Sequence, residues 1–229
     1  MTRLSLRSAG CGPEVRISED LSTEDTIRRH PKRKIGILAF GSLIKDPGAE
    51  LLPKIAMRIK TQTPFPVEYG RISGRTRGGT PTLVPHESGA PVSAEILVLD
   101  DDVSIEETRN MLWRRETRQR DTSRTYTRGS SDNSVLVEEF HDDPCVETVL
   151  YTNFNLSGKI PHPTAADLAY KTIESVAAAP EGMDGITYLM NAIRSGIETP
   201  LTADYKAEIL KQTMTLTLED ALKEVKERQ

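Results

Sequence analysis

The chain has 229 residues, a formal net charge of −4 and a hydrophobic fraction of 37%. This length fits one large or two small globular domains, with enough apolar residues to bury a core. The slightly negative charge gives no electrostatic case for nucleic-acid binding, and no apolar run approaches the length needed to span a membrane. The two cysteines, Cys11 and Cys145, lack metal-ligand spacing, so we expect no zinc site and a reducing, cytoplasmic location.

Residues 1–33 are polar and charged and show no sustained hydrophobic periodicity. They contain no apolar core segment of the kind a secretory signal needs. We expect them to form an N-terminal arm that is loosely held or serves as an interface. Residues 34–229 are expected to form a single domain.

The clearest strand signal is the apolar run from Ile35 to Phe40, which ends in Gly41-Ser42-Leu43. Its length suits a buried strand. Glycine at the end of a strand lets a ligand approach the backbone, and successive free N–H groups in such a turn can bind a carboxylate or an oxyanion. A strand followed by an ordinary turn is the simpler interpretation of the same residues.

Further apolar or alternating stretches bounded by turn residues predict more strands. These are Phe65–Ile72, Thr82–Val84, Val92–Leu99, Ser134–Phe140 and Val146–Tyr151. The turn residues between the last two predict a hairpin, whereas residues 51–59 show no clear pattern. Residues 74–81 are rich in glycine and arginine and cannot be helical. They form either an anion-binding loop or a solvated connection.

A helix is predicted to begin at Ser104, because Glu107 follows three residues later in the form of a capping box. Glu116 lies one turn after Leu112 on the apolar face of this helix. A carboxylate carried toward a core must be neutral, paired or functional, because an unpaired buried charge is very costly. Arginines surround Glu116 in sequence, so a salt bridge near the helix end is the alternative to a functional role.

Four more helices are expected after residue 153, and they begin near Thr164, Ile186, Thr202 and Thr217. Strands therefore come first and helices later, with one helix inserted among the strands. This order favours an α+β fold with a curled, mostly antiparallel sheet or a small barrel over a doubly wound sheet.

Several motifs, taken in order, resemble those of the gamma-glutamylcyclotransferase superfamily, and its ChaC-like glutathione-degrading branch in particular. Phe40-Gly41-Ser42-Leu43 is similar to the Tyr-Gly-Ser-Leu turn of the family, and residues 75–81 are similar to its Arg-Gly-Thr-Pro stretch. Arg115-Glu116 after Leu112 resembles the Leu-x-x-Arg-Glu motif that carries the catalytic glutamate. Residues 182–197, with Tyr188-Leu189, resemble the family's C-terminal helical hairpin.

The resemblance implies a small, mostly antiparallel β-barrel with flanking helices, and a reaction that needs no metal or organic cofactor. The α-amine of a γ-glutamyl group attacks its own γ-carbonyl and releases 5-oxoproline and an amine. Glu116 would be the general acid and base, and the backbone of Gly41, Ser42 and Leu43 would stabilise the oxyanion. We therefore expect Gly41 and Glu116 to face one cavity, and the N–H groups of Ser42 and Leu43 to be free of strand pairing.

The resemblance also implies substrate-binding side chains. One of Arg71, Arg75 and Arg77 would hold the α-carboxylate, and the residues do not decide which. Tyr126 is a match to the tyrosine that follows the catalytic glutamate, although the spacing from the glutamate is longer here. Phe40 replaces the family's tyrosine, so any hydroxyl contact at that position is lost.

Two other classes of function compete with an enzyme. The first is a non-catalytic protein that binds γ-glutamyl compounds or small anions on the same fold. The second is nucleic-acid binding through the arginines that follow residue 108, but few aromatic residues accompany them, and such a cluster is usually a solvated or ion-paired face. We expect a small γ-glutamyl molecule as the partner, and no nucleic acid or membrane. Glutathione, other γ-glutamyl peptides and γ-glutamylamines all remain candidate substrates.

Overall fold

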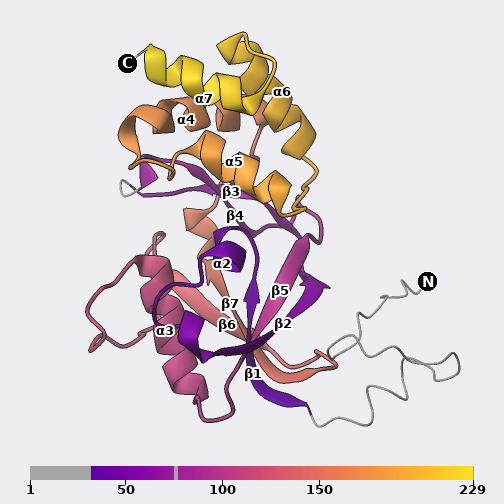
Figure 1. Ribbon diagram of the computed structural model, residues 1–229, viewed down its shortest axis with the longest axis vertical. Helices are drawn as coiled ribbons and strands as arrows, with labels where there is room; N and C mark the ends of the chain where they lie inside the picture. The colour runs from indigo at the N-terminus through magenta and orange to yellow at the C-terminus, as the bar shows by residue number, and fades with distance from the viewer. Residues whose placement is uncertain (1–31, 75–76, 229) are drawn as a thin grey trace, which may run out of the picture.

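The computed structural model describes residues 32–74 and 77–228. The expected N-terminal arm, apart from Lys32 and Arg33, and the candidate residue Arg75 therefore lie outside the described residues. The described chain has a mixed α+β architecture with two sheets and flanking helices, which confirms the expected class at this level. Figure 1 shows a lower part built around one sheet, and an upper part in which four helices lie over a second, smaller sheet.

The larger sheet has five strands in the order β2-β5-β1-β7-β6. Their bounds are Arg33–Ala39 for β1, Ile55–Gln62 for β2, Ser93–Leu99 for β5, Val135–Phe140 for β6 and Val146–Phe154 for β7. Neighbours are antiparallel except for β1 and β7, which run parallel. The sheet is thus mostly antiparallel, as expected, and β6 and β7 form the predicted hairpin.

The described residues do not close into the expected small barrel. Strands β2 and β6 are the two edges of the five-stranded sheet and do not pair with each other. Strands β3 (Val67–Ile72) and β4 (Pro81–Pro85) could have extended that sheet, but they pair with each other in a separate two-stranded sheet. These two strands pack against the C-terminal helices, and the edge strands β2 and β6 of the larger sheet have no further strand of the described chain beside them.

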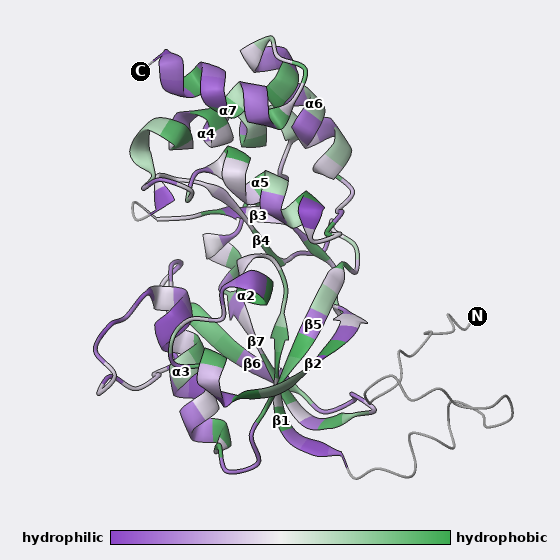
Figure 2. Ribbon diagram, viewed as in Figure 1, coloured by the Kyte–Doolittle hydropathy of each residue, from purple (hydrophilic) through white to green (hydrophobic). Residues whose placement is uncertain are grey.

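Strand β1 occupies the centre of the larger sheet and is apolar on both faces. Ile37 and Ala39 face helix α3 (Ile105–Thr117), and they form one buried cluster with Met111 and Leu112 of that helix. Leu38 points to the opposite face and joins a separate cluster with residues of β5 and β7. Figure 2 shows these central strands as the hydrophobic part of the lower half. Burial on both faces explains the unbroken apolar run in the sequence.

The upper part packs helices α4 (Ala165–Ala178), α5 (Gly185–Arg194), α6 (Thr202–Thr213) and α7 (Leu218–Glu227) against β3 and β4. One large apolar cluster joins the four helices to these two strands, with Tyr69 and Tyr205 completely buried in it. The caps expected at Thr164 and Thr217 are confirmed, since each side chain accepts a hydrogen bond from the N–H three residues later. Ser104 caps α3 in the same way.

Three short helices complete the described elements: α2 (Ser42–Lys45), η1 (Leu52–Lys54) and η3 (Leu156–Gly158). Helix α2 follows β1 directly through Gly41 and lies at the junction of the lower and upper parts (Figure 1). Across residues 32–74 and 77–228, none of the helices combines the length and the apolar character that crossing a membrane would require.

Candidate functional site

A cavity of about 310 Å³ lies where the end of β1 meets the end of α3 and the strands β3 and β4. Most residues that the sequence singled out contribute to its wall. These are Phe40, Ser42, Leu43, Arg71, Arg77 and Glu116. A second cavity of about 210 Å³ adjoins it, and Gly41 and Ser42 both contribute to the wall of that one. The turn after β1 therefore lies between the two cavities. Gly41 itself lines the second cavity and Glu116 the first, so the expectation that both face one cavity is not met for Gly41, although Ser42 and Leu43 share the first cavity with Glu116.

Gly41 has a backbone conformation that other residues rarely adopt, with φ 63° and ψ −134°. A Cβ atom at this position would also lie only 2.9 Å from the hydroxyl oxygen of Tyr188. The turn therefore needs glycine for its conformation and for the close approach of helix α5. The backbone N–H groups of Ser42 and Leu43 follow Gly41, lie beyond the last paired residue of β1, and donate to no group in the described chain. This agrees with the expectation that they are free of strand pairing.

Glu116 lies near the C-terminal end of α3, with 21% of its side chain exposed. Its Oε1 atom is 2.5 Å from Nη1 of Arg115, so the ion pair considered as the alternative to a functional role is present. The same guanidinium donates to the carbonyl oxygen of Asp46 and lies 3.3 Å from Oγ of Ser42. Arg115 thus connects the Glu116 carboxylate to the turn that follows β1, on the wall of one cavity.

Arg71 carries a partly buried guanidinium with few partners. Its Nη2 atom is 3.3 Å from Oδ1 of Asn133, and its guanidinium carbon lies 4.0 Å from the centre of the Phe154 ring. Its Nε atom is buried and has no hydrogen-bond partner among the described residues, and the same holds for Oγ of Ser73 nearby on the same wall. Burial lowers the pKa of Arg71, while the charge of Glu116 opposes that effect. An anion in the cavity would satisfy these donors.

Tyr188 is a further candidate that the sequence placed in a family motif but not in the site. It comes from α5, its ring lies 5.9 Å from the Arg77 guanidinium carbon, and it contributes to the wall of both cavities. Its hydroxyl oxygen accepts a hydrogen bond from the N–H of Leu83 at 3.3 Å. The hydroxyl proton is therefore free to be donated elsewhere. Burial raises the pKa of Tyr188, so this proton is retained at neutral pH.

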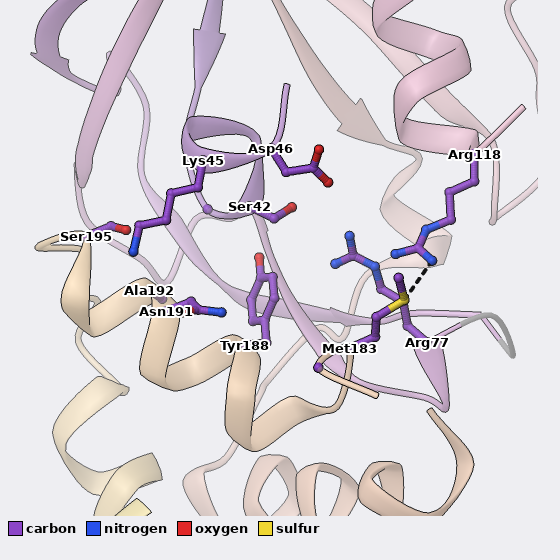
Figure 3. Close-up of a pocket in the computed structure, with 12 residues that line it drawn as sticks. Ser42, Lys45, Asp46, Arg77, Arg118, Met183, Tyr188, Asn191, Ala192 and Ser195 are labelled. Atoms are coloured by element: carbon purple, nitrogen blue, oxygen red, sulfur yellow. Dashed lines mark hydrogen bonds between the residues drawn. The ribbon is translucent and has the colours of Figure 1, made fainter. Parts of the chain in front are cut away.

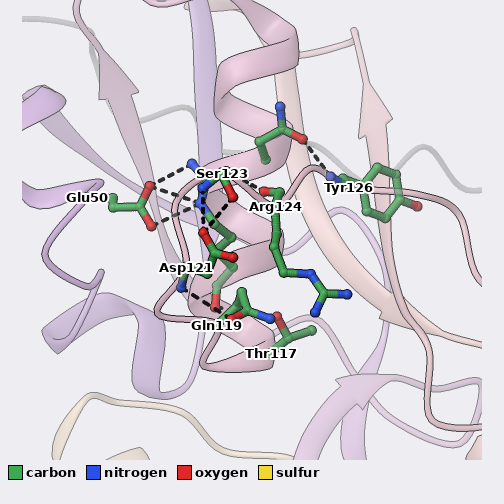
Figure 4. Close-up of polar contacts among 9 residues, drawn as sticks. Glu50, Thr117, Gln119, Asp121, Ser123, Arg124 and Tyr126 are labelled. Carbon is green, nitrogen blue, oxygen red and sulfur yellow. Dashed lines mark hydrogen bonds and ion pairs between the residues drawn. The ribbon is translucent and has the colours of Figure 1, made fainter.

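Tyr126 is not brought to the cavity. Its hydroxyl accepts from the N–H of Val137, its own N–H donates to Oδ1 of Asn110, and its ring packs against the apolar cluster under α3. Figure 4 shows Tyr126 on the loop after α3, away from the residues around Arg124. Tyr126 therefore packs against α3 and β6 rather than lining the cavity.

The arginines after residue 108 are largely paired with carboxylates. Arg109 pairs with Glu139, Arg128 with Glu138, and the buried guanidinium of Arg114 with Glu50. Arg114 also donates to the carbonyl of Arg124, in the loop between α3 and β6. These contacts give most of the cluster a structural role.

The described residues form no group of three or more histidine, cysteine, aspartate or glutamate side chains able to hold a metal ion. The charged chemistry of the cavity consists of one carboxylate, Glu116, and several guanidinium groups. Such a wall suits a ligand that has both carboxylate and ammonium groups. In the comparisons with known proteins, no family model, no curated protein and no solved structure matches this chain.

Proposed function

We propose that this protein is a gamma-glutamylcyclotransferase that converts a γ-glutamyl compound to 5-oxoproline and a free amine. The observation that carries the proposal is the meeting of Glu116 with the turn after β1 on the wall of one cavity. These two elements are far apart in the sequence, and each was identified separately by its likeness to the same family. The wall also provides guanidinium groups for a substrate carboxylate.

Arg71 is the best candidate for binding the α-carboxylate. Its buried Nε has no partner among the described residues, and Ser73 offers an unpaired hydroxyl on the same wall. Arg77 instead lies beside Tyr188 and faces both cavities. A substrate carboxylate at Arg71 leaves its α-ammonium free to approach the Glu116 carboxylate.

The proposed chemistry needs no nucleophile from the protein. The substrate α-nitrogen forms a bond to the γ-carbon, and the bond from that carbon to the leaving nitrogen breaks. Overall the α-nitrogen loses two protons and the leaving nitrogen gains two. Glu116 would relay protons between them, which typically contributes about 10²–10⁴-fold in rate. Holding amine and carbonyl together can supply roughly 7–11 kcal/mol of the barrier.

The oxyanion that forms on the γ-carbonyl needs donors in fixed positions. The unpaired N–H groups of Ser42 and Leu43 are the proposed donors, and the free hydroxyl proton of Tyr188 is a third. Gly41 brings the turn and Tyr188 together, because no side chain separates them. On this proposal the chain works without a cofactor in the cytoplasm, and binds neither nucleic acid nor membrane.

A panel of γ-glutamyl compounds tests the proposal. The purified protein is incubated with glutathione, a second γ-glutamyl peptide and a γ-glutamylamine, and 5-oxoproline is measured over time. We expect stoichiometric release of 5-oxoproline and the amine from at least one compound. Release of glutamate instead would mean that water is the nucleophile, and no product from any compound would contradict the proposal.

One observation favours a second candidate, a γ-glutamyl or small-anion binding protein without catalysis. Arg115 forms an ion pair with Oε1 of Glu116. A carboxylate fixed in this way can bind a substrate ammonium group without transferring a proton. Calorimetry with the same panel separates the two candidates. Saturable binding without 5-oxoproline would establish the binding protein, and turnover would exclude it.

A further inference from the structure

The second cavity is a continuation of the first rather than a separate site. Ser42, Arg77, Arg118 and Tyr188 contribute to the walls of both cavities. The rest of the second wall comes from α2, from α5 and from the residues just before α5, as Figure 3 shows. If the γ-amide of a substrate lies at the turn and its α-carboxylate at Arg71, the part beyond the amide extends into this second cavity.

Arg118 has an unusual backbone conformation at this junction. It follows the last residue of α3 with φ 54° and ψ 32°, in the left-handed region. Glycine is the usual residue there, because a side chain raises the energy of this conformation. A cation is favourable at a helix C-terminus, but Arg114 and Arg115 already provide positive charge in the last turn. The helix end therefore gives no sufficient reason for arginine at position 118.

The guanidinium of Arg118 has a weak set of partners. Within the described chain its only side-chain hydrogen bond runs from Nη1 to the thioether sulfur of Met183, at 2.9 Å (Figure 3). A thioether is a weak acceptor. Partial burial lowers the pKa of Arg118, and the neighbouring cations Arg77 and Arg115 add to that effect. A carboxylate at this position would replace a weak acceptor and offset the repulsion among the three guanidinium groups.

The charges of the second cavity favour an anionic occupant. Lys45, Arg77 and Arg118 are its cations, and Asp46 is its only carboxylate. Figure 3 shows Lys45 on one side of Tyr188, and Arg77 and Arg118 on the other. Arg77 and Arg118 both face the two cavities, and neither forms an ion pair within the described residues. Arg77 already lies beside the Tyr188 ring, whereas the Arg118 guanidinium donates, among the described groups, only to the Met183 sulfur, so Arg118 is the better placed to bind the leaving part of a substrate.

We propose that the second cavity receives the leaving part of the substrate, and that Arg118 binds a carboxylate on it. The protein then prefers γ-glutamyl peptides with a free C-terminal carboxylate over γ-glutamylamines. This inference rests on the proposed cyclotransferase function. It assigns Arg118 as a residue that determines specificity, whereas Glu116 would carry the chemistry.

Three matched compounds test this specificity: γ-glutamyl-alanyl-glycine, the same peptide with a C-terminal amide, and γ-glutamyl-methylamide. In the unmodified protein we expect kcat/KM for the peptide acid to exceed that for the peptide amide by about tenfold or more, as for loss of a hydrogen bond to a charged group. In Arg118→Gly the ratio of kcat/KM for the peptide acid to kcat/KM for the peptide amide should fall to near one. Turnover of γ-glutamyl-methylamide, which has no carboxylate, should change little.

Glycine at position 118 also separates binding from folding. Because glycine suits the left-handed conformation, Arg118→Gly should not lower the melting temperature. Arg120→Ala, an exposed arginine outside both cavities, is the matched control and should keep the full preference.

Three results would overturn the proposal. Equal kcat/KM for the acid and the amide in the unmodified protein, with 5-oxoproline still released, would reject carboxylate recognition and leave the proposed function intact. Loss of the preference in Lys45→Ala but not in Arg118→Gly would place the carboxylate elsewhere. Absence of 5-oxoproline from all three compounds would reject the proposed function and this inference together.

Discussion

The hydroxyl oxygen of Tyr188 lies so close to Gly41 that a Cβ on residue 41 would be 2.9 Å from it. This contact joins the turn after β1 to helix α5, and so fixes the boundary between the two cavities. The contact also places the Tyr188 hydroxyl beside the turn whose Ser42 and Leu43 N–H groups are proposed to stabilise the oxyanion.

We predict that Gly41→Ala destabilises the protein and abolishes turnover. The conformation of Gly41 is strained for any other residue, at a cost of about 1–3 kcal/mol, and the new methyl group must displace Tyr188. For a chain of this size each kcal/mol lowers the melting temperature by roughly 2–4 °C. Thermal unfolding and 5-oxoproline release measure the two effects.

Gly196→Ala is the matched control for this prediction. Gly196 also has a positive φ, 70°, but a Cβ there would come no nearer than 3.6 Å to another residue, and it faces neither cavity. It should lower stability while 5-oxoproline release per folded molecule is preserved. If Gly41→Ala behaves like this control, the turn has no role in turnover.

Local sequence patterns were enough to predict most of the fold elements. The caps at Ser104, Thr164 and Thr217 depend only on a side chain and an N–H three residues away. Strand β2 was missed, although Ile55, Met57 and Ile59 alternate with polar residues in the manner of a strand with one buried face. The helical 3₁₀ turn just before β2 obscured this alternation.

The arrangement of the strands was harder to predict, because it depends on contacts between distant segments. β1 pairs in parallel with β7, so that Gly36 lies opposite Val149. No local pattern encodes such a pairing. The separate pairing of β3 with β4 likewise leaves the larger sheet open, and the expected barrel does not form among the described residues.

A conservative change at Arg71 tests where the α-carboxylate binds. Arg71→Lys keeps the positive charge but loses the planar fork and the Nε donor. We expect KM for the γ-glutamyl substrate to rise by about tenfold or more, as for a lost hydrogen bond between charged groups, with a smaller change in kcat.

Two further lysine variants make the test of Arg71 specific. Arg109→Lys is the control, because that arginine pairs with Glu139 away from both cavities, and it should have normal kinetics. Arg77→Lys tests the competing assignment. A larger rise in KM for Arg77→Lys than for Arg71→Lys would show that Arg77, and not Arg71, binds the substrate α-carboxylate.

The upper part should lose stability in alkaline solution. Burial raises the pKa values of Tyr69, Tyr188 and Tyr205 above the ordinary value of 10.0. As pH rises past about 10, the unfolded chain releases these protons while the folded chain retains them, so the free energy of unfolding falls. Lys159 acts in the opposite direction, because burial lowers its pKa.

Denaturant unfolding between pH 8 and 11 measures this dependence. Tyr205→Phe removes a hydroxyl that is hydrogen-bonded to Thr172 and should lower stability at pH 8. The same variant should show a shallower loss of stability above pH 10, because one titrating group is gone. An unchanged pH dependence would mean that Tyr205 ionises as readily in the folded chain as in the unfolded one.

A site residue could be predicted from the sequence when its position on a single helix was enough to identify it. Glu116 was singled out because it follows Leu112 by one turn, and that spacing needs no knowledge of the rest of the fold. Tyr188 reaches the same cavities only because α5 packs over the turn after β1, which is a tertiary contact. Tyr126 shows the converse: its match to a family position did not place it at the cavity.

The most direct test of the account is 5-oxoproline release by Glu116→Gln. This change keeps the volume of the side chain and removes its ability to accept a proton from the substrate. Glu106→Gln, an exposed residue in the first turn of the same helix, is the matched control and should keep its activity. Melting temperatures of both variants show whether they are folded.

We predict that Glu116→Gln remains folded, binds the substrate with little change in affinity, and releases 5-oxoproline at least about 10²-fold more slowly than the unmodified protein. This is the pattern of a group needed in the transition state. If Glu116 serves only as the partner of Arg115, the variant should instead melt at a lower temperature and keep its turnover per folded molecule. A folded Glu116→Gln protein with near-normal 5-oxoproline release would contradict the account.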